Sequence, residues 1–177
     1  FEGKFVIKAP DWEYIPRITV ARSEIKRSYT PHRQGDIPLI VIEFLSDTEG
    51  GEYSTQQTYP PGKWFFYEQI VQVSNYLIFE PDSGTLEVYS LDEQGKYETQ
   101  TLDENNRYWL PEMNLYIGVW LGKRENRDGY WLRWWDRQGN LLLWGAELVQ
   151  QEREAKEAAL QRLSELEKRL RDAGIEP

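Results

Sequence analysis

"IPLIVIEFLS", residues 37–46, is the stretch of sequence that decides the fold. From Leu39 to Leu45 every residue is apolar except Glu43. A short apolar run of this kind predicts a strand over residues 38–45 that is buried on both faces. Removing a carboxylate from water is costly unless a partner compensates it. Glu43 therefore pairs either with an arginine or lysine, as an ordinary buried glutamate does, or with a bound cation, and the sequence leaves both open.

The flanking sequence predicts one α/β fold with a mixed sheet. Apolar alternation, turn residues and helical spacing of apolar residues define the elements. They are an extended segment at 4–16 that ends or bends near Asp11, a polar loop or loose hairpin at 17–36, a helix at 63–73, a hairpin at 75–91, short strands at 107–121, a hairpin at 129–144, and a long helix from 146 to about 173. Helices flanking a mixed sheet with hairpins, followed by a long C-terminal helix, are thus expected.

Composition restricts the function. The net charge of −9 argues against a protein that coats nucleic acid by bulk electrostatics, although a local basic patch remains compatible with it. The chain has no cysteine, which excludes disulfides and thiolate metal sites. No apolar run approaches the roughly 18 residues of a membrane span, so we expect no membrane partner and a cytoplasmic location. Because the chain begins at Phe1 within an apparent strand, an N-terminal segment is expected to be missing.

Three polar residues stand where a purely structural pattern does not need them: Asp11 after Pro10, Glu43 in the buried strand, and Lys63 at the start of a helix. Two carboxylates on neighbouring strands can share a divalent cation, which removes the cost of burying them. A nearby lysine can orient or deprotonate an attacking water, or neutralise charge that develops on a phosphate. Asp, Glu and Lys around one metal are typical of phosphodiester hydrolysis.

A basic cluster lies between the two carboxylate-bearing strands. It consists of Arg17, Arg22, Lys26, Arg27 and Arg33. These side chains either contact DNA phosphates or form a solvated loop, and the sequence favours the second reading slightly.

Four stretches carry a resemblance to a known family. They are Pro10 with Asp11, residues 43–46, Lys63 with Tyr67, and "YLIFEP" at 76–81. In this order they resemble the Uma-type (Uma-two) family of restriction endonucleases, a bacterial branch of the PD-(D/E)XK nuclease superfamily. The superfamily's founding pattern has its lysine two residues after the glutamate, where this chain has Leu45, so Lys63 would take that role.

The resemblance implies a restriction-endonuclease-like α/β fold, with a mixed β-sheet and flanking helices, and a metal-dependent DNA endonuclease. Asp11, Glu43 and Lys63 would be its catalytic residues, and Asp11, Glu43 and the carbonyl of Phe44 would bind Mg²⁺, with Mn²⁺ as a substitute. Residues 1–145 would form the nuclease-like domain, with an N-terminal helical part missing, and residues 146–177 a helix that is a candidate homodimerisation element. The alternative is an inactive nuclease fold that acts as an interaction or regulatory module.

Overall fold

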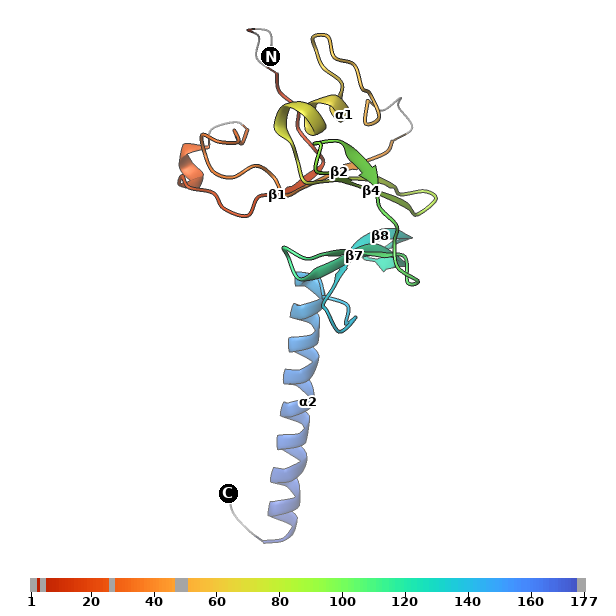
Figure 1. Cartoon of the computed structure of the whole chain (residues 1–177). Helices are drawn as coiled ribbons and strands as arrows, with labels where there is room; N and C mark the ends of the chain where they lie inside the picture. The colour runs from red at the N-terminus through yellow and green to blue at the C-terminus, as the bar shows by residue number, and fades with distance from the viewer. Residues whose placement is uncertain (1–2, 4–5, 26–27, 47–50, 175–177) are drawn as a thin grey trace.

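The computed structural model describes residue 3 and residues 6–25, 28–46 and 51–174. Two β-sheets face each other, and a long helix projects away from the second sheet (Figure 1). This mixed α/β architecture confirms the expected fold class.

The larger sheet has five strands, whose order in space follows their order in the chain. They are β1 (Trp12–Tyr14), β2 (Ile40–Phe44), β3 (Asn75–Glu80), β4 (Thr85–Leu91) and β5 (Tyr97–Thr99). Only β2 and β3 run parallel, with Glu43 opposite Ile78. A parallel pair requires a crossover connection. Here the crossover contains α1 (Lys63–Phe65) and the π-helix η2 (Phe66–Val71), which cover one face of the sheet.

Alternation along the central strands divides the core between the two faces. Val41 of β2 and Ile78 of β3 pack with Tyr67 on the helical face. Ile40 and Ile42 belong to the core on the opposite face, which the second sheet covers. Glu43 has the same parity as Val41, so its side chain emerges on the helical face, beneath α1 and η2.

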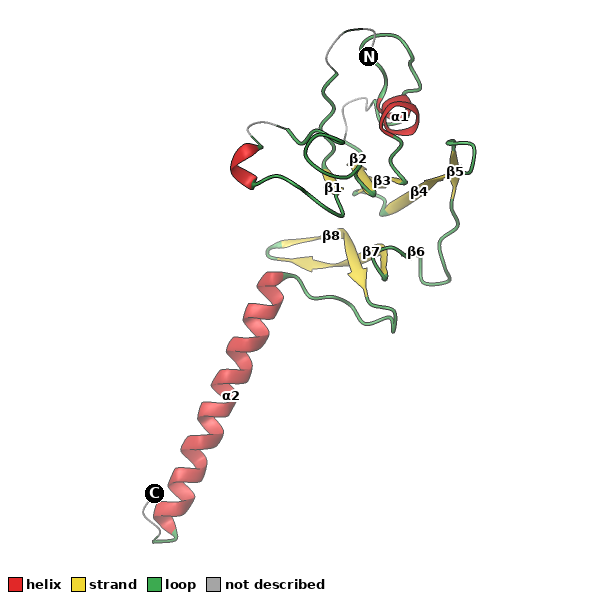
Figure 2. Ribbon diagram, turned by 60° about the vertical axis from the view of Figure 1, so that its left-hand side comes forward, coloured by secondary structure: helices red, strands yellow, loops and turns green. Residues whose placement is uncertain are grey.

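The second sheet is antiparallel, and the C-terminal helix follows it (Figure 2). Its elements are β6 (Arg107–Leu110), β7 (Leu115–Arg124) and β8 (Arg127–Trp135), followed by α2 (Gly145–Asp172). The guanidinium of Arg133 is buried and pairs with Glu147 at 2.7 Å. It also lies 3.6 Å from the ring centroid of Trp144, so the start of α2 is fixed to β8 by a cation–π contact and an ion pair.

The predicted hairpin at 75–91 is confirmed as β3 and β4. The described residues of the predicted loop or loose hairpin at 17–36 contain a short 3-10 helix, η1 (Arg22–Glu24), and an isolated bridge between Ile18 and Gly35. Two other predictions need correction. The predicted extended segment at 4–16 contains a strand only at Trp12–Tyr14 in its described part, so Asp11 precedes the strand; Pro10 has no N–H to contribute to a ladder. The predicted hairpin at 129–144 reduces to one bridge, between Trp135 and Leu141, because β8 pairs with β7 instead.

The helix predicted at 63–73 is present over residues 63–71, but most of it is π-helical. Over nine residues, apolar spacing does not distinguish the two windings. A π segment is rare and is found frequently at functional sites, which directs attention to the residues around Lys63 and Tyr67.

Candidate active site

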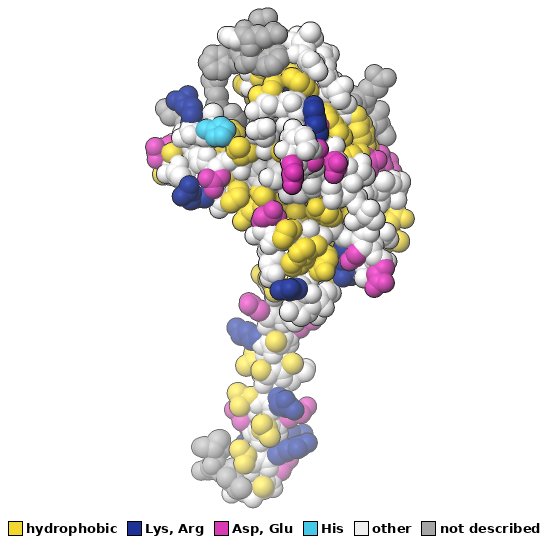
Figure 3. All heavy atoms as spheres, viewed as in Figure 1, with side chains coloured by type: hydrophobic (Ala, Val, Ile, Leu, Met, Phe, Trp, Pro, Cys, Tyr) yellow, Lys and Arg dark blue, Asp and Glu magenta, His cyan; other side chains and the backbone are white. Residues whose placement is uncertain are grey.

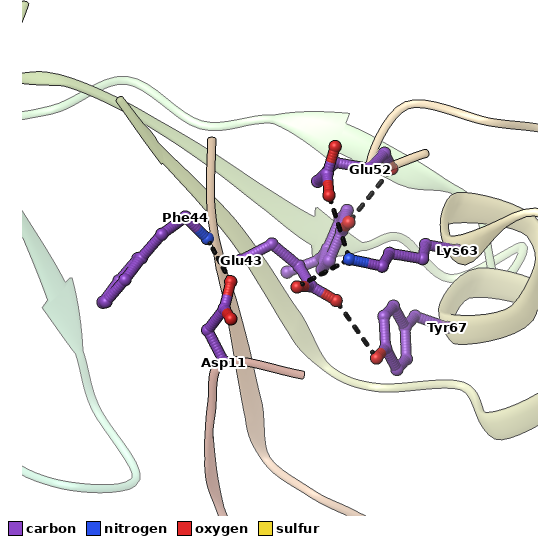
Figure 4. A network of polar contacts seen from close by, with 7 residues as sticks. Asp11, Glu43, Phe44, Glu52, Lys63 and Tyr67 are labelled. Atoms are coloured by element: carbon purple, nitrogen blue, oxygen red, sulfur yellow. Dashed lines mark hydrogen bonds and ion pairs between the residues drawn. The ribbon is translucent and has the colours of Figure 1, made fainter. Parts of the chain in front are cut away.

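Glu43 is fully buried near the carboxyl end of β2, and both oxygens of its carboxylate accept a hydrogen bond (Figure 4). Lys63 donates from Nζ to Oε2 at 3.0 Å, and the hydroxyl of Tyr67 donates to Oε1 at 3.2 Å. Because Lys63 and Tyr67 are four residues apart, both side chains reach the same carboxylate from one side of the α1–η2 segment. The partner of the buried glutamate is therefore a lysine, supported by a tyrosine.

Lys63 has a second acidic partner, Glu52, which the sequence did not single out. The Nζ of Lys63 lies 2.9 Å from Oε1 of Glu52, and Glu52 is 6% exposed. The backbone carbonyl of Glu52 accepts a hydrogen bond from the Tyr76 hydroxyl at 3.0 Å, which fixes this loop over β3. A glutamate in a turn-rich linker normally lies in solvent, so no sequence signal marked Glu52.

Asp11 lies beside Glu43 but uses its carboxylate differently. Its Oδ2 accepts a hydrogen bond from the backbone N–H of Phe44 at 2.7 Å (Figure 4). This contact follows from the antiparallel pairing of β1 with β2, in which Trp12 lies opposite Ile42. The structure thus brings Asp11, Glu43 and Lys63 into one neighbourhood from three separate segments of the chain.

Electrostatics at the site are a balance of burial and charge. Burial raises the pKa of Glu43; Lys63 and Tyr67 lower it, and the negative charge of Asp11 raises it, so the net pKa is above the ordinary value. Burial alone would lower the pKa of Lys63, but hydrogen bonds and charges from Glu52 and Glu43 outweigh it and raise that pKa. Lys63 is accordingly an ammonium group at neutral pH.

Asp11 and Glu43 supply carboxylates, the ligand type that magnesium takes, in one neighbourhood. Among the described residues, no group of three or more Asp, Glu or His side chains forms a metal cluster. Magnesium, however, typically uses one or two carboxylates and keeps several waters. Asp11, Glu43 and Glu52 carry three negative charges and Lys63 one positive charge, which leaves −2, the charge that one divalent cation neutralises. The repulsion between Asp11 and Glu43 is a cost that such a cation would remove.

The predicted DNA-contacting residues are distributed over the loop before β2. Arg17 pairs with Asp36 at 3.4 Å, Arg22 donates to the carbonyl of Ile25 at 3.1 Å, and Arg33 is exposed. Lys26 and Arg27 lie outside the described residues. The exposure of Arg17 and Arg33 fits either a phosphate-binding or a solvated loop.

The described residues contain no helix that is both long and apolar enough to cross a membrane.

Comparison with known proteins identifies a family. A family model, Uma2, described as "Putative restriction endonuclease", matches residues 2–123, a range that includes Asp11, Glu43, Glu52, Lys63 and Tyr67. No curated protein and no solved structure gives a significant match. Because the matched region is more than half of the 177 residues, the chain belongs to the Uma2 family, which is of the PD-(D/E)XK type.

Proposed function

We propose that this protein is a metal-dependent endonuclease that hydrolyses DNA phosphodiester bonds with Asp11, Glu43 and Lys63. The observation that carries the proposal is the fully buried Glu43, which shares Lys63 with a second glutamate while Asp11 lies alongside. For stability alone, a buried ion pair is often no better than apolar side chains of similar size. Carboxylates whose pKa is perturbed by burial and by a neighbouring charge are typical of functional sites.

The residues that would hold Mg²⁺ or Mn²⁺ are Asp11, Glu43 and the backbone carbonyl of Phe44. When bound, the ion would supply Lewis acidity toward a phosphate oxygen and lower the pKa of a bound water. Lys63, as an ammonium group, would donate a hydrogen bond to the phosphate or to the water and neutralise charge that builds up there. The attacking water oxygen would form a bond to phosphorus and lose a proton to solvent, one ester P–O bond would break, and the departing oxygen would take up a proton from solvent.

DNA would be held by local positive charge. Arg17 and Arg33 are exposed, and the loop that contains them connects β1 to β2, the two strands beside the site. Arg22, Lys26 and Arg27 belong to the same loop in sequence. Because the net charge is −9, binding through so few cations should be weak and should fall steeply with salt. A cytoplasmic location, where DNA and Mg²⁺ occur together, suits this activity.

A different function, as an interaction module with no catalysis, is favoured by one feature, the exposed helix α2. None of its residues is buried, and Figure 3 shows hydrophobic side chains interspersed with charged ones along it. The exposed apolar side chains are Leu148, Val149, Leu160, Leu163, Leu166 and Leu170. We propose that a second copy of α2 covers them in a homodimer, an arrangement that also suits an enzyme that cuts both strands. Light scattering after gel filtration tests this: a dimer should become a monomer in Leu163→Glu/Leu166→Glu.

The nuclease proposal is tested by metal binding and by plasmid nicking. Isothermal titration with Mn²⁺ should give heat with the wild type and much weaker binding with Glu43→Gln. Nicking of a supercoiled plasmid with Mn²⁺ should disappear in the same variant. Glu68→Gln is the matched control, because Glu68 is 7% exposed and pairs with Lys96, not with Lys63. Wild-type protein that neither binds Mn²⁺ nor nicks DNA would refute the nuclease and favour the interaction module.

A further inference from the structure

We propose that Glu52 is a positioning residue that holds the side chain of Lys63 beside Glu43, so that Lys63 presents its remaining N–H donor in a fixed direction. The inference rests on the proposed function for its catalytic meaning. Its structural part, the control of Lys63 by Glu52, stands independently of catalysis.

The first step concerns how many N–H groups of Lys63 remain available to donate a hydrogen bond. An ammonium group has three N–H donors. Glu43 accepts one at 3.0 Å and Glu52 accepts another at 2.9 Å. Among the described residues these are its two acceptors, which leaves one N–H for an outside oxygen, such as that of a phosphate or a water. A lysine held by two fixed acceptors presents its third donor in a defined direction.

The second step concerns the side chain's freedom. Lys63 is 25% exposed at its side chain, and an exposed lysine with one partner loses much of that contact to rotamer entropy. Glu43 is fixed by β2, and Glu52 is fixed through its backbone carbonyl, which Tyr76 holds from β3. Two acceptors on separate, anchored elements hold Nζ between them (Figure 4). Lys63 would keep one anchored acceptor, Glu52, when Glu43 is engaged by another ligand.

The third step concerns the stability that the protein loses by burying Glu52. Glu52 is buried, and among the described residues its second oxygen, Oε2, has no hydrogen-bond partner. A buried unsatisfied oxygen destabilises a protein and calls for an explanation beyond stability. Glu68, the comparable buried glutamate, shows the contrast, because it accepts bonds from Gln69, Lys96 and the backbone of Tyr97. Glu52 is better explained by what it does to Lys63 than by what it contributes to folding.

The experiment is an NMR relaxation measurement of the order of the Lys63 side-chain terminus in wild type, Glu52→Gln and the control Glu68→Gln, with Lys63→Arg to assign the signal. We expect Glu52→Gln to lower the order parameter of the Lys63 terminus and Glu68→Gln to leave it unchanged. An unchanged order parameter in Glu52→Gln, in protein whose circular dichroism is that of wild type, overturns the inference. Should Glu52→Gln fail to fold, Glu52→Asp replaces it, with a smaller loss of order expected and no loss overturning the inference.

Plasmid nicking supplies the catalytic arm. Glu52→Gln should slow nicking about 10- to 100-fold, as loss of a residue that orients a ligand of the chemistry typically does. Glu52→Asp, which keeps the carboxylate, should recover part of that rate, whereas a merely structural defect would not be rescued in this way. A wild-type protein that does not nick DNA removes the proposed function, whereas the NMR measurement still decides whether Glu52 controls Lys63. Unchanged nicking in Glu52→Gln overturns the positioning role.

Discussion

Lys63→Met tests whether the lysine is the counter-ion on which the buried carboxylates depend. The substitution keeps most of the side-chain volume and removes the one positive charge that lies 3.0 Å from Glu43 and 2.9 Å from Glu52. Removing one partner of a buried pair typically costs about 3–5 kcal/mol. Because the Lys63 side chain is 25% exposed and water reaches the site from that side, we expect the lower end, about 3 kcal/mol at pH 8.

The loss should shrink at low pH, and the sign follows from the pKa of Glu43. That pKa is already raised by burial above its ordinary 4.5, and without Lys63 it rises further. A carboxyl group with a raised pKa in the folded state binds more protons there than in the unfolded state. The free energy of unfolding of the variant should therefore fall as pH rises from about 4.5 through the raised pKa. The gap to wild type is small near pH 5 and large at pH 8.

Urea unfolding followed by tryptophan fluorescence at pH 5 and pH 8 measures this gap. Lys96→Met is the control, since Lys96 is 59% exposed in its pair with Glu68 and should cost about 1 kcal/mol or less at either pH. A loss in Lys63→Met that is below about 1 kcal/mol and independent of pH would refute the argument. Glu43 would then be satisfied by Tyr67 alone.

Two further predictions concern the supports of the site and of the helix. Gly62→Ala should destabilise the protein by about 1–3 kcal/mol in urea unfolding and should slow plasmid nicking. The new Cβ would collide with the backbone carbonyl of Ser54 and displace the adjacent Lys63. Wild-type stability and a wild-type nicking rate in this variant would contradict the prediction. Arg133→Met should cost about 3 kcal/mol in the same unfolding assay, since Arg133 is 1% exposed and lies between Glu147 and Trp144. Nicking by the folded Arg133→Met variant should be preserved, because the contacts of Arg133 among the described residues are with Leu142, Glu147 and the rings of Trp120 and Trp144, and not with Lys63. A selective loss of nicking would show that the two regions are coupled.

Local patterns in the sequence were enough to predict the parts of the fold that depend on near neighbours. The apolar run around Glu43 predicted β2, and alternation with a turn predicted the hairpin at 75–91. The four-residue spacing of Lys63 and Tyr67 placed them on one side of a helix, and the structure shows both bonded to one carboxylate. These features could be predicted because each depends on fewer than twenty consecutive residues.

Features that depend on distant segments were not predictable in this way. Glu52 enters the site because Tyr76 of β3 holds its loop, a contact between residues 24 positions apart. The strand at Arg127–Trp135 pairs with β7, whereas the sequence suggested pairing with the residues that follow it, since both choices satisfy the same apolar alternation. The π winding of η2 has no signature in apolar spacing over so few residues.

The position of Glu43 on β2 gives a reason why a charged group persists in this core. Glu43 lies one residue before the carboxyl end of β2, which is one strand of the parallel β2–β3 pair. In α/β sheets, ligands bind outside the carboxyl ends of strands, because the crossover connection leaves room there. The residues before Glu43 on β2 are apolar and buried, which is what stability requires of a central strand. The strand departs from that pattern where it reaches this edge. There the ammonium group of Lys63 lies 3.0 Å from the carboxylate of Glu43 and 2.9 Å from that of Glu52. A requirement of packing alone would have continued the apolar run through position 43.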